Sequence, residues 1–209
     1  MWEKDPQVMH AGLEVHNACL RKCIAENRGY EVKTVGDSFV VAFHNVPDAA
    51  AFMLSAQHAL LQQSWSEALL KLPNCESTLF NQDILYRQSS KSVIASSPIE
   101  KAETPSWLWR GLRVRMGCHV GAVDREYCEV TGRVDYFGPA VNMAARIESL
   151  AHGGEILVSE LCCAANLRES HGSYLRSLGM VPSCRGGGGG VCVCVMLCTT
   201  SNKPTYFMG

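Results

Sequence analysis

The 209-residue sequence has no long hydrophobic run, since its longest apolar stretches fall well short of the roughly 18 residues that a membrane-spanning helix needs. Its first ten residues, MWEKDPQVMH, are charged and contain no apolar segment, so we expect no signal peptide and no membrane segment in this chain. The net charge of −1 gives no excess of positive charge, which argues against binding to nucleic acid through charge alone. With 47% hydrophobic residues, the chain can form the core of one domain.

The sequence also has no cysteine spacing that is typical of a disulfide framework, although it contains eleven cysteines. Seven of them lie between Cys19 and Cys163, and we interpret these as free thiols in a reducing cytosol. The other four crowd towards the C-terminal end, at Cys184, Cys192, Cys194 and Cys198.

The order of expected helices and strands indicates an α+β fold. Apolar spacing and turn residues predict a helix over 9–28, a hairpin over 30–43, a helix over 47–72, a strand over 111–123, a helix over 138–152 and a strand over 155–160. The polar stretch 73–106 is predicted to be an inserted loop. This order predicts helices packed on a mostly antiparallel sheet.

The C-terminal part, 166–209, does not continue this pattern. It contains five consecutive glycines followed by a run of valine and cysteine. A CxC metal site lacks a supporting His or paired CxxC, and a membrane anchor would be too short. We therefore favour a tail foreign to the fold, so that the folded domain covers residues 1–165.

The hairpin segment EVKTVGDSF places Lys33 and Asp37 four residues apart. An aspartate at a tight turn directs its carboxylate away from the sheet, where it can hold Mg²⁺ together with phosphate oxygens. Lys33 on a strand face would need an acceptor for its ammonium group. Gly-Asp turns and strand lysines are also common in ordinary hairpins, so this segment alone favours a surface turn.

A second group of polar residues lies at the start of the third predicted helix. Asn142 and Arg146 are four residues apart and therefore share one helix face, close to the end whose dipole favours phosphate. Asp135 precedes this helix by a few residues. Taken alone, these residues are equally consistent with the surface of an amphipathic helix.

Together the two segments resemble the class III adenylate and guanylate cyclases, and most closely the trypanosomatid receptor-type adenylate cyclases. The resemblance rests on YEVKTVGDSF, on Trp65 after the second helix, on the strand LWRGLRVRMGCHVG, and on the pattern EVT-x-x-x-DY-x-G…NMAAR. It covers roughly residues 2–165. It implies the class III cyclase fold with a ferredoxin-like core.

The resemblance also implies a role for each site residue. Asp37 would be one of two metal-binding aspartates. Lys33 would donate to a ring nitrogen of adenine, and Asp135 would accept from its exocyclic amine. Asn142 would orient the ribose, and Arg146 would stabilise charge on the α-phosphate. Guanylate cyclases typically carry Glu and a small residue such as Cys where Lys33 and Asp135 stand here, so a guanylate cyclase is the less favoured alternative.

The implied reaction is conversion of ATP to cyclic AMP and pyrophosphate, with two Mg²⁺ or Mn²⁺ ions. In this family the site forms between two domains, so the implied partner is a second copy or a related cyclase domain, not a nucleic acid. Full-length relatives are membrane-anchored and hold the cyclase domain in the cytosol.

The sequence departs from the family pattern in two places. The first metal aspartate, in an opening Phe-x-Asp-Ile strand, is not found, and no triphosphate-binding lysine follows EILVSE. We therefore expect a domain truncated at both ends, with an unpaired sheet edge and with weak or no activity. The alternative is a degenerate, non-catalytic module that dimerises or binds nucleotide.

Overall fold

The computed structural model describes residues 5–79, 107–162 and 191–199. A five-stranded sheet in the order β1-β2-β9-β5-β8 forms its centre. These strands are β1 (Tyr30–Val35), β2 (Ser38–Phe43), β9 (Val191–Thr199), β5 (Arg113–Gly121) and β8 (Ile156–Val158). All neighbouring strands are antiparallel except β5 and β8, which are parallel. The predicted α+β class with a mostly antiparallel sheet is confirmed.

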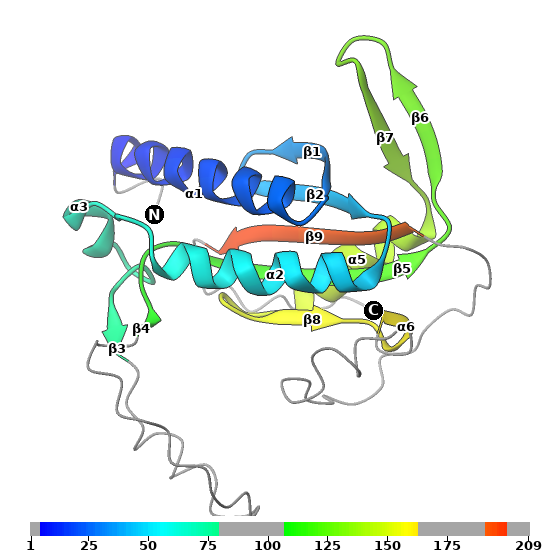
Figure 1. Ribbon diagram of the computed structural model, residues 1–209. Helices are drawn as coiled ribbons and strands as arrows, with labels where there is room; N and C mark the ends of the chain where they lie inside the picture. Colours follow the sequence, from blue (N-terminus) through cyan, green and yellow to red (C-terminus); the bar gives the residue numbers. More distant parts are fainter. Residues whose placement is uncertain (1–4, 80–106, 163–190, 200–209) are drawn as a thin grey trace, which may run out of the picture.

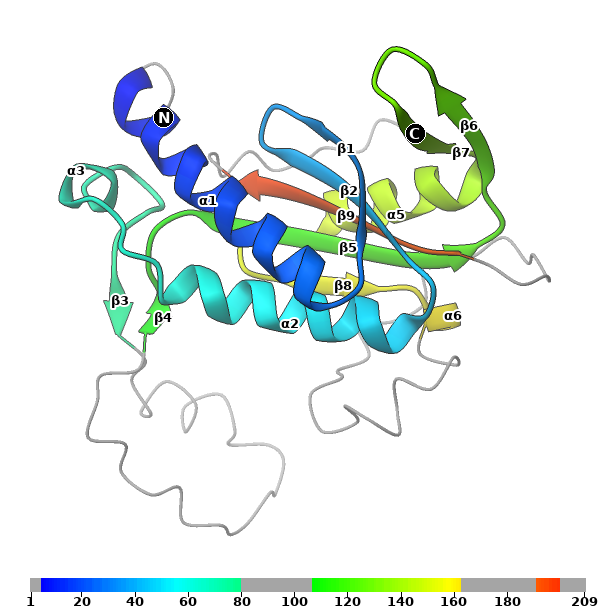
Figure 2. The same ribbon diagram turned by 45° about the horizontal axis from the view of Figure 1, so that its top comes forward.

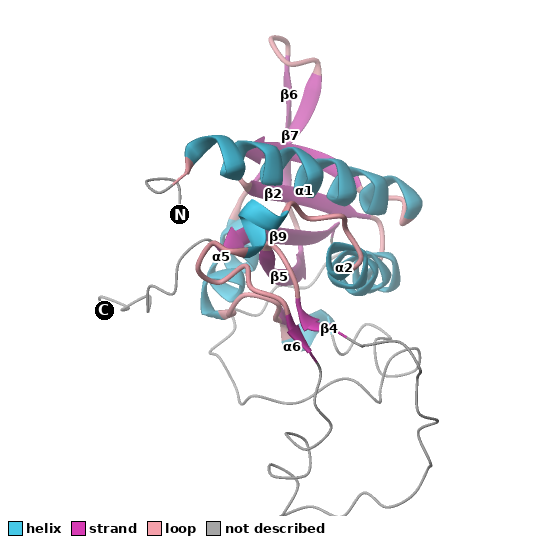
Figure 3. Cartoon of the chain, turned by 90° about the vertical axis from the view of Figure 1, so that its left-hand side faces the viewer, coloured by secondary structure: helices cyan, strands magenta, loops and turns pink. Residues whose placement is uncertain are grey.

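Helices cover both faces of this sheet. The longer helices α1 (Pro6–Glu26) and α2 (Val46–Leu61) lie on one face, and α5 (Pro139–Leu150) lies on the other (Figures 1 and 3). The predicted helix over 47–72 is in fact two, because α2 ends at Leu61 and a short α3 (Glu67–Leu70) follows. A further short helix, α6, spans Glu160–Cys162. Among the described residues, no helix is both long and apolar enough to cross a membrane.

The main hydrophobic core lies between the sheet and the pair α1 and α2. Alternate residues of β2 and β5 are buried there, as period-2 alternation requires; they are Phe39, Val41, Phe43, Val114, Met116 and Cys118. The opposite face carries Gly117, where an added Cβ would lie 2.2 Å from the backbone nitrogen of Glu148 in α5. This glycine therefore lets α5 pack directly on β5.

Two small hairpins stand outside the main sheet. The strands β6 (Asp124–Cys128) and β7 (Arg133–Phe137) form an antiparallel pair that projects from the body (Figures 1 and 2). This hairpin was not predicted from the sequence. The other pair, β3 (Thr78–Leu79) and β4 (Trp107–Trp109), joins the two ends of the predicted inserted loop. Most of that loop lies outside the described residues.

The structure differs from the sequence prediction at Val191–Thr199. This segment was expected to lie outside the fold, but it forms β9, which pairs with β2 on one side and β5 on the other. A central strand covered on both faces is a continuous apolar run rich in β-branched residues, and VCVCVMLCT fits that description. The predicted unpaired edge is thus occupied, while the rest of 166–209 lies outside the described residues.

Candidate active site

The β1–β2 hairpin presents the first predicted site residue, Asp37. Its turn consists of Gly36 and Asp37, between the paired residues Val35 and Ser38. Gly36 has a φ of +62°, which suits glycine at the first position of a two-residue hairpin turn. Asp37 is half-buried there.

Lys33 and Asp135 form an ion pair, although they are 102 residues apart in the sequence. The Lys33 Nζ lies 2.9 Å from Asp135 Oδ2, and 5.1 Å from the centre of the Phe137 ring. The backbone nitrogen of Tyr136 donates to Asp135 Oδ1 at 2.8 Å. The lysine therefore has the acceptor that the sequence analysis required, and the two residues expected to read the base lie together.

Asn142 and Arg146 lie on an exposed face of α5. The helix begins after Gly138, whose φ of +111° is a conformation that glycine adopts readily. Pro139 occupies the first turn of the helix. Within the described residues, no hydrogen bond or ion pair connects either side chain to Asp37 or Lys33. The residues predicted to act on the ribose and the α-phosphate are thus presented to solvent rather than assembled with the hairpin.

An ion pair beneath this face fixes α5 to the sheet. Arg115 of β5 donates to Glu148 of α5, and both side chains are largely buried. Burial raises the pKa of Glu148, while Arg115 opposes that shift. Glu148 follows Arg146 by two residues, so its ion pair with Arg115 fixes the part of α5 that carries Arg146 relative to the sheet.

Asp37 is the carboxylate at the hairpin turn that can take part in holding a metal ion. Mg²⁺ is commonly bound by one or two carboxylates, with phosphate oxygens completing its shell. The described part of the chain contains no cluster of three or more His, Cys, Asp or Glu side chains that could hold a metal. Asp37 therefore suits an ion that the phosphates of a nucleotide help to bind.

His16 is a residue near this turn that the sequence analysis placed only in a helix pattern. It is fully buried in α1, with its ring edge against Phe39 at 5.9 Å and its Nδ1 2.9 Å from Asn17 Oδ1. Burial lowers the pKa of His16, opposed by the Asn17 hydrogen bond and by the charge of Asp37. The sequence signal was a lone histidine among apolar helix positions.

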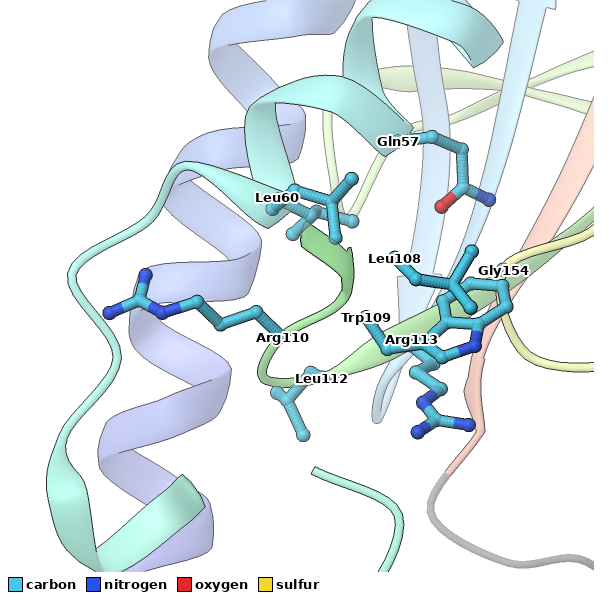
Figure 4. A pocket seen from close by; sticks show the side chains of 9 residues that line it. Gln57, Leu60, Leu108, Trp109, Arg110, Leu112, Arg113 and Gly154 are labelled. Carbon is cyan, nitrogen blue, oxygen red and sulfur yellow. The ribbon is translucent and has the colours of Figure 1, made fainter. Parts of the chain in front are cut away.

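A cavity of about 220 Å³ lies elsewhere, between the end of α2 and the β4–β5 connection (Figure 4). Its walls include Leu60, Trp109 and Leu112, with Arg113 stacked 4.9 Å from the Trp109 ring. None of the predicted site residues lines this cavity. It therefore belongs to the inserted-loop end of the domain, not to the hairpin.

Comparison with known proteins identifies the family. Residues 1–183 match the adenylate and guanylate cyclase catalytic domain. The chain belongs to this family. The resemblance seen in YEVKTVGDSF and NMAAR is confirmed, and the chain contains a cyclase domain.

Named relatives and a solved structure agree with this assignment. The cyclase domain is 35% identical over 160 residues to a receptor-type adenylate cyclase B of Leishmania donovani, covering 77% of this chain and 12% of that protein. It is 36% identical over 159 residues to an adenylate cyclase of Schizosaccharomyces pombe, covering 76% of this chain and 8% of the relative. A Trypanosoma brucei adenylate cyclase structure in its monomeric state matches with a TM-score of 0.64 and 31% identity, over 93% of this chain and 82% of that chain. The chain thus spans only a small part of its curated relatives.

Proposed function

We propose that this cyclase domain converts ATP to cyclic AMP and pyrophosphate. The observation that carries the proposal is the Lys33–Asp135 ion pair, at 2.9 Å. It presents a cationic donor beside an anionic acceptor, and the edge of adenine offers a ring-nitrogen acceptor beside an amino donor. Guanine carries a carbonyl oxygen where adenine carries the amino group and a ring N–H where adenine carries the ring nitrogen, so the pair fits adenine better when Lys33 faces the ring nitrogen and Asp135 faces the amino group.

In the proposed reaction, the ribose 3′-oxygen attacks the α-phosphorus in line with the pyrophosphate leaving group. A bond forms between the 3′-oxygen and phosphorus, the bond to pyrophosphate oxygen breaks, and the 3′-hydroxyl proton leaves. Asn142 orients the ribose, and Arg146 stabilises the negative charge that develops on the α-phosphate. Mg²⁺ or Mn²⁺, held in part by Asp37, would lower the pKa of the 3′-hydroxyl and neutralise phosphate charge.

The proposal includes a dimer of two cyclase domains. Within the described residues of one chain, Asp37 makes no hydrogen bond or ion pair with Asn142 or Arg146, and in the proposed dimer one chain's turn faces the other chain's helix. The β6–β7 hairpin supports this arrangement because it projects from the body and carries apolar surface. Tyr127 is 63% exposed and Val130 is 95% exposed.

We also propose that the domain works in the cytosol. Its six described free cysteines, five of them buried, suit a reducing compartment, and ATP is available there. This agrees with the receptor-type relatives, for which the cyclase part would face the cell interior.

A second candidate is a nucleotide-binding or dimerising module with little turnover. The observation that favours it is that β9, the strand beside β2 at the Asp37 turn, contains no Asp or Glu between Val191 and Thr199. A second carboxylate for a two-metal site is therefore not found on that strand. Guanylate cyclase activity is disfavoured by the charges of Lys33 and Asp135.

The experiment that tests the proposal compares ATP with GTP. With purified protein and Mn²⁺, we expect cyclic AMP to form faster than cyclic GMP, and ATP to bind more tightly than GTP. The double variant Lys33→Glu with Asp135→Cys should shift both ratios toward GTP, because unpaired polar groups then oppose adenine. Lys22→Glu on exposed α1 surface is the matched control. Equal binding of both nucleotides by the unmutated protein would contradict the assignment, while selective ATP binding without product would favour the non-catalytic module.

A further inference from the structure

Side chains, rather than backbone hydrogen bonds, hold the β6–β7 hairpin against the main sheet. Strand β1 pairs through its backbone with β2, and β7 pairs with β6. Between β1 and β7, the backbone nitrogen of Val134 donates to Tyr30 Oη at 2.9 Å, and the Tyr30 and Tyr136 rings lie 6.1 Å apart. The Lys33–Asp135 ion pair belongs to the same contact. Side-chain contacts with β1 therefore help to set the position of Asp135, alongside the pairing of β7 with β6.

Glu31 is at the centre of a second polar network on β1, two residues before Lys33. Arg21 of α1 donates to it through Nε at 3.0 Å and through Nη2 at 3.2 Å. The Thr34 hydroxyl donates to Glu31 Oε1 at 2.8 Å, and Arg133 Nη1 of β7 lies 3.8 Å from the same oxygen. Only 12% of the Glu31 side chain is exposed. Glu31 thus connects α1 and β1 to the base of the projecting hairpin.

The two ion pairs between β1 and β7 have opposite charge order. Glu31 faces Arg133, and two residues further along both strands Lys33 faces Asp135. Each pair joins a cation to an anion across the contact, so both pairs hold β7 against β1.

A β-bulge explains how Glu31 and Lys33 serve different neighbours. The register of β1 shifts between these residues, so that Glu31 pairs with Val41 while Lys33 pairs with Val40. Val40 and Val41 are consecutive and point to opposite faces, and the bulge therefore turns Lys33 away from the face on which Glu31 meets Arg21. Glu31 can only affect the base-reading pair indirectly, through the placement of β1 and β7.

We propose that Glu31 is a positioning residue that sets where β7 lies along β1 and so keeps Asp135 against Lys33. This rests on the proposed function, because its consequence is discrimination between adenine and guanine. In a purely structural role, Glu31 would only clamp α1 to β1 through Arg21. The two roles differ in which arginine matters, since Arg133 belongs to the hairpin and Arg21 belongs to α1.

Nucleotide preference is the first readout. We expect Glu31→Gln and Arg133→Gln each to reduce the ratio of ATP to GTP affinity about threefold to fivefold, measured with fluorescent analogues of both nucleotides. The double variant should be no worse than Glu31→Gln alone, because both changes break the same contact. Arg21→Gln should change the ratio less, and Glu26→Gln, an exposed carboxylate at the end of α1, should leave it unchanged.

Hydrogen exchange at the Val134 amide is the second readout and needs no nucleotide. This N–H donates to Tyr30, so its protection reports the β1–β7 contact. We expect Glu31→Gln and Arg133→Gln to speed its exchange about threefold to fivefold, with thermal unfolding of Arg133→Gln unchanged. Unchanged exchange and unchanged ATP to GTP ratio in Arg133→Gln would overturn the proposal. If the unmutated protein showed no ATP preference, the proposed function would fail, while the exchange result would still decide whether Glu31 positions β7.

Discussion

The two halves of the candidate site differ in how far one chain assembles them. On the side that we propose reads the base, Lys33 and Asp135 lie 102 residues apart in the sequence and meet in a 2.9 Å ion pair. On the phosphate side, Asn142 and Arg146 lie exposed on α5, and no described contact connects them to Asp37. The first half is complete before any ligand arrives, and the second is not.

This difference separates recognition from chemistry. A preformed pair of polar groups can select a base at little ordering cost, because its side chains are already placed. Residues that act on developing charge are useful only when phosphate and a metal bring them together. A single copy should therefore select adenine before it can cyclise ATP.

The strongest test of the phosphate side is Arg146→Ala. We expect turnover of ATP to fall about 10²–10³-fold, as for removal of one donor to developing charge, while ATP affinity changes little. The measurement is cyclic AMP formed under single-turnover conditions with excess protein and Mn²⁺, beside a nucleotide-binding titration. Lys71→Ala, which removes a distant exposed cation, is the control. Equal losses of binding and rate would place Arg146 on the base-reading side of the comparison.

Sequence pattern sufficed for the parts that form through local contacts. The Gly36-Asp37 hairpin and the helix with Asn142 and Arg146 follow from turn residues and apolar period alone. The Lys33–Asp135 contact needed the family resemblance, because no local rule predicts a pair so far apart in sequence. Their assigned roles remain predictions.

The features that the sequence did not predict depend on contacts between segments that are far apart in the chain. The β6–β7 hairpin carries little buried apolar surface, so Tyr127 and its neighbours gave no alternation toward a core. Strand β9 was missed because a strand buried between neighbours shows no polar alternation, and five preceding glycines suggested a tail. Glu31 looked like an ordinary strand carboxylate, since its partners on α1 and β7 are brought to it only by folding.

A second test asks whether a carboxylate on β9 can supply a second metal ligand beside Asp37 and so increase turnover. Ser38 pairs with Leu197, so continuation of that register places Cys198 beside the Asp37 turn. We expect Cys198→Asp to increase Mn²⁺-dependent cyclic AMP formation about tenfold, equivalent to about 1.4 kcal/mol in the barrier. Cys198→Asn provides the matched control, because it has similar size and no charge. No gain over Cys198→Asn, in protein that remains folded, would mean that the missing ligand is not the limiting defect.

The smallest expected effect concerns His16, which lies under the hairpin that presents Asp37. Its titration shows whether water enters that region. Burial lowers the pKa of His16 below its ordinary value of 6.5, so below about pH 6.5 the unfolded chain takes up a proton that the folded chain excludes. The free energy of unfolding should therefore fall as the pH decreases from about 6.5, with a slope of at most about 1.4 kcal/mol per pH unit for one proton. His16→Leu fills the same apolar site without titrating, and urea unfolding of both proteins between about pH 7.5 and 5.5 isolates the contribution of His16. Above the ordinary histidine pKa, the difference between the two free energies of unfolding should be constant. Below that pKa, the free energy of unfolding of the unmutated protein should fall relative to that of His16→Leu. Parallel curves for the two proteins over the whole range would show that folding does not change the pKa of His16, and hence that the region beneath Asp37 is open to water.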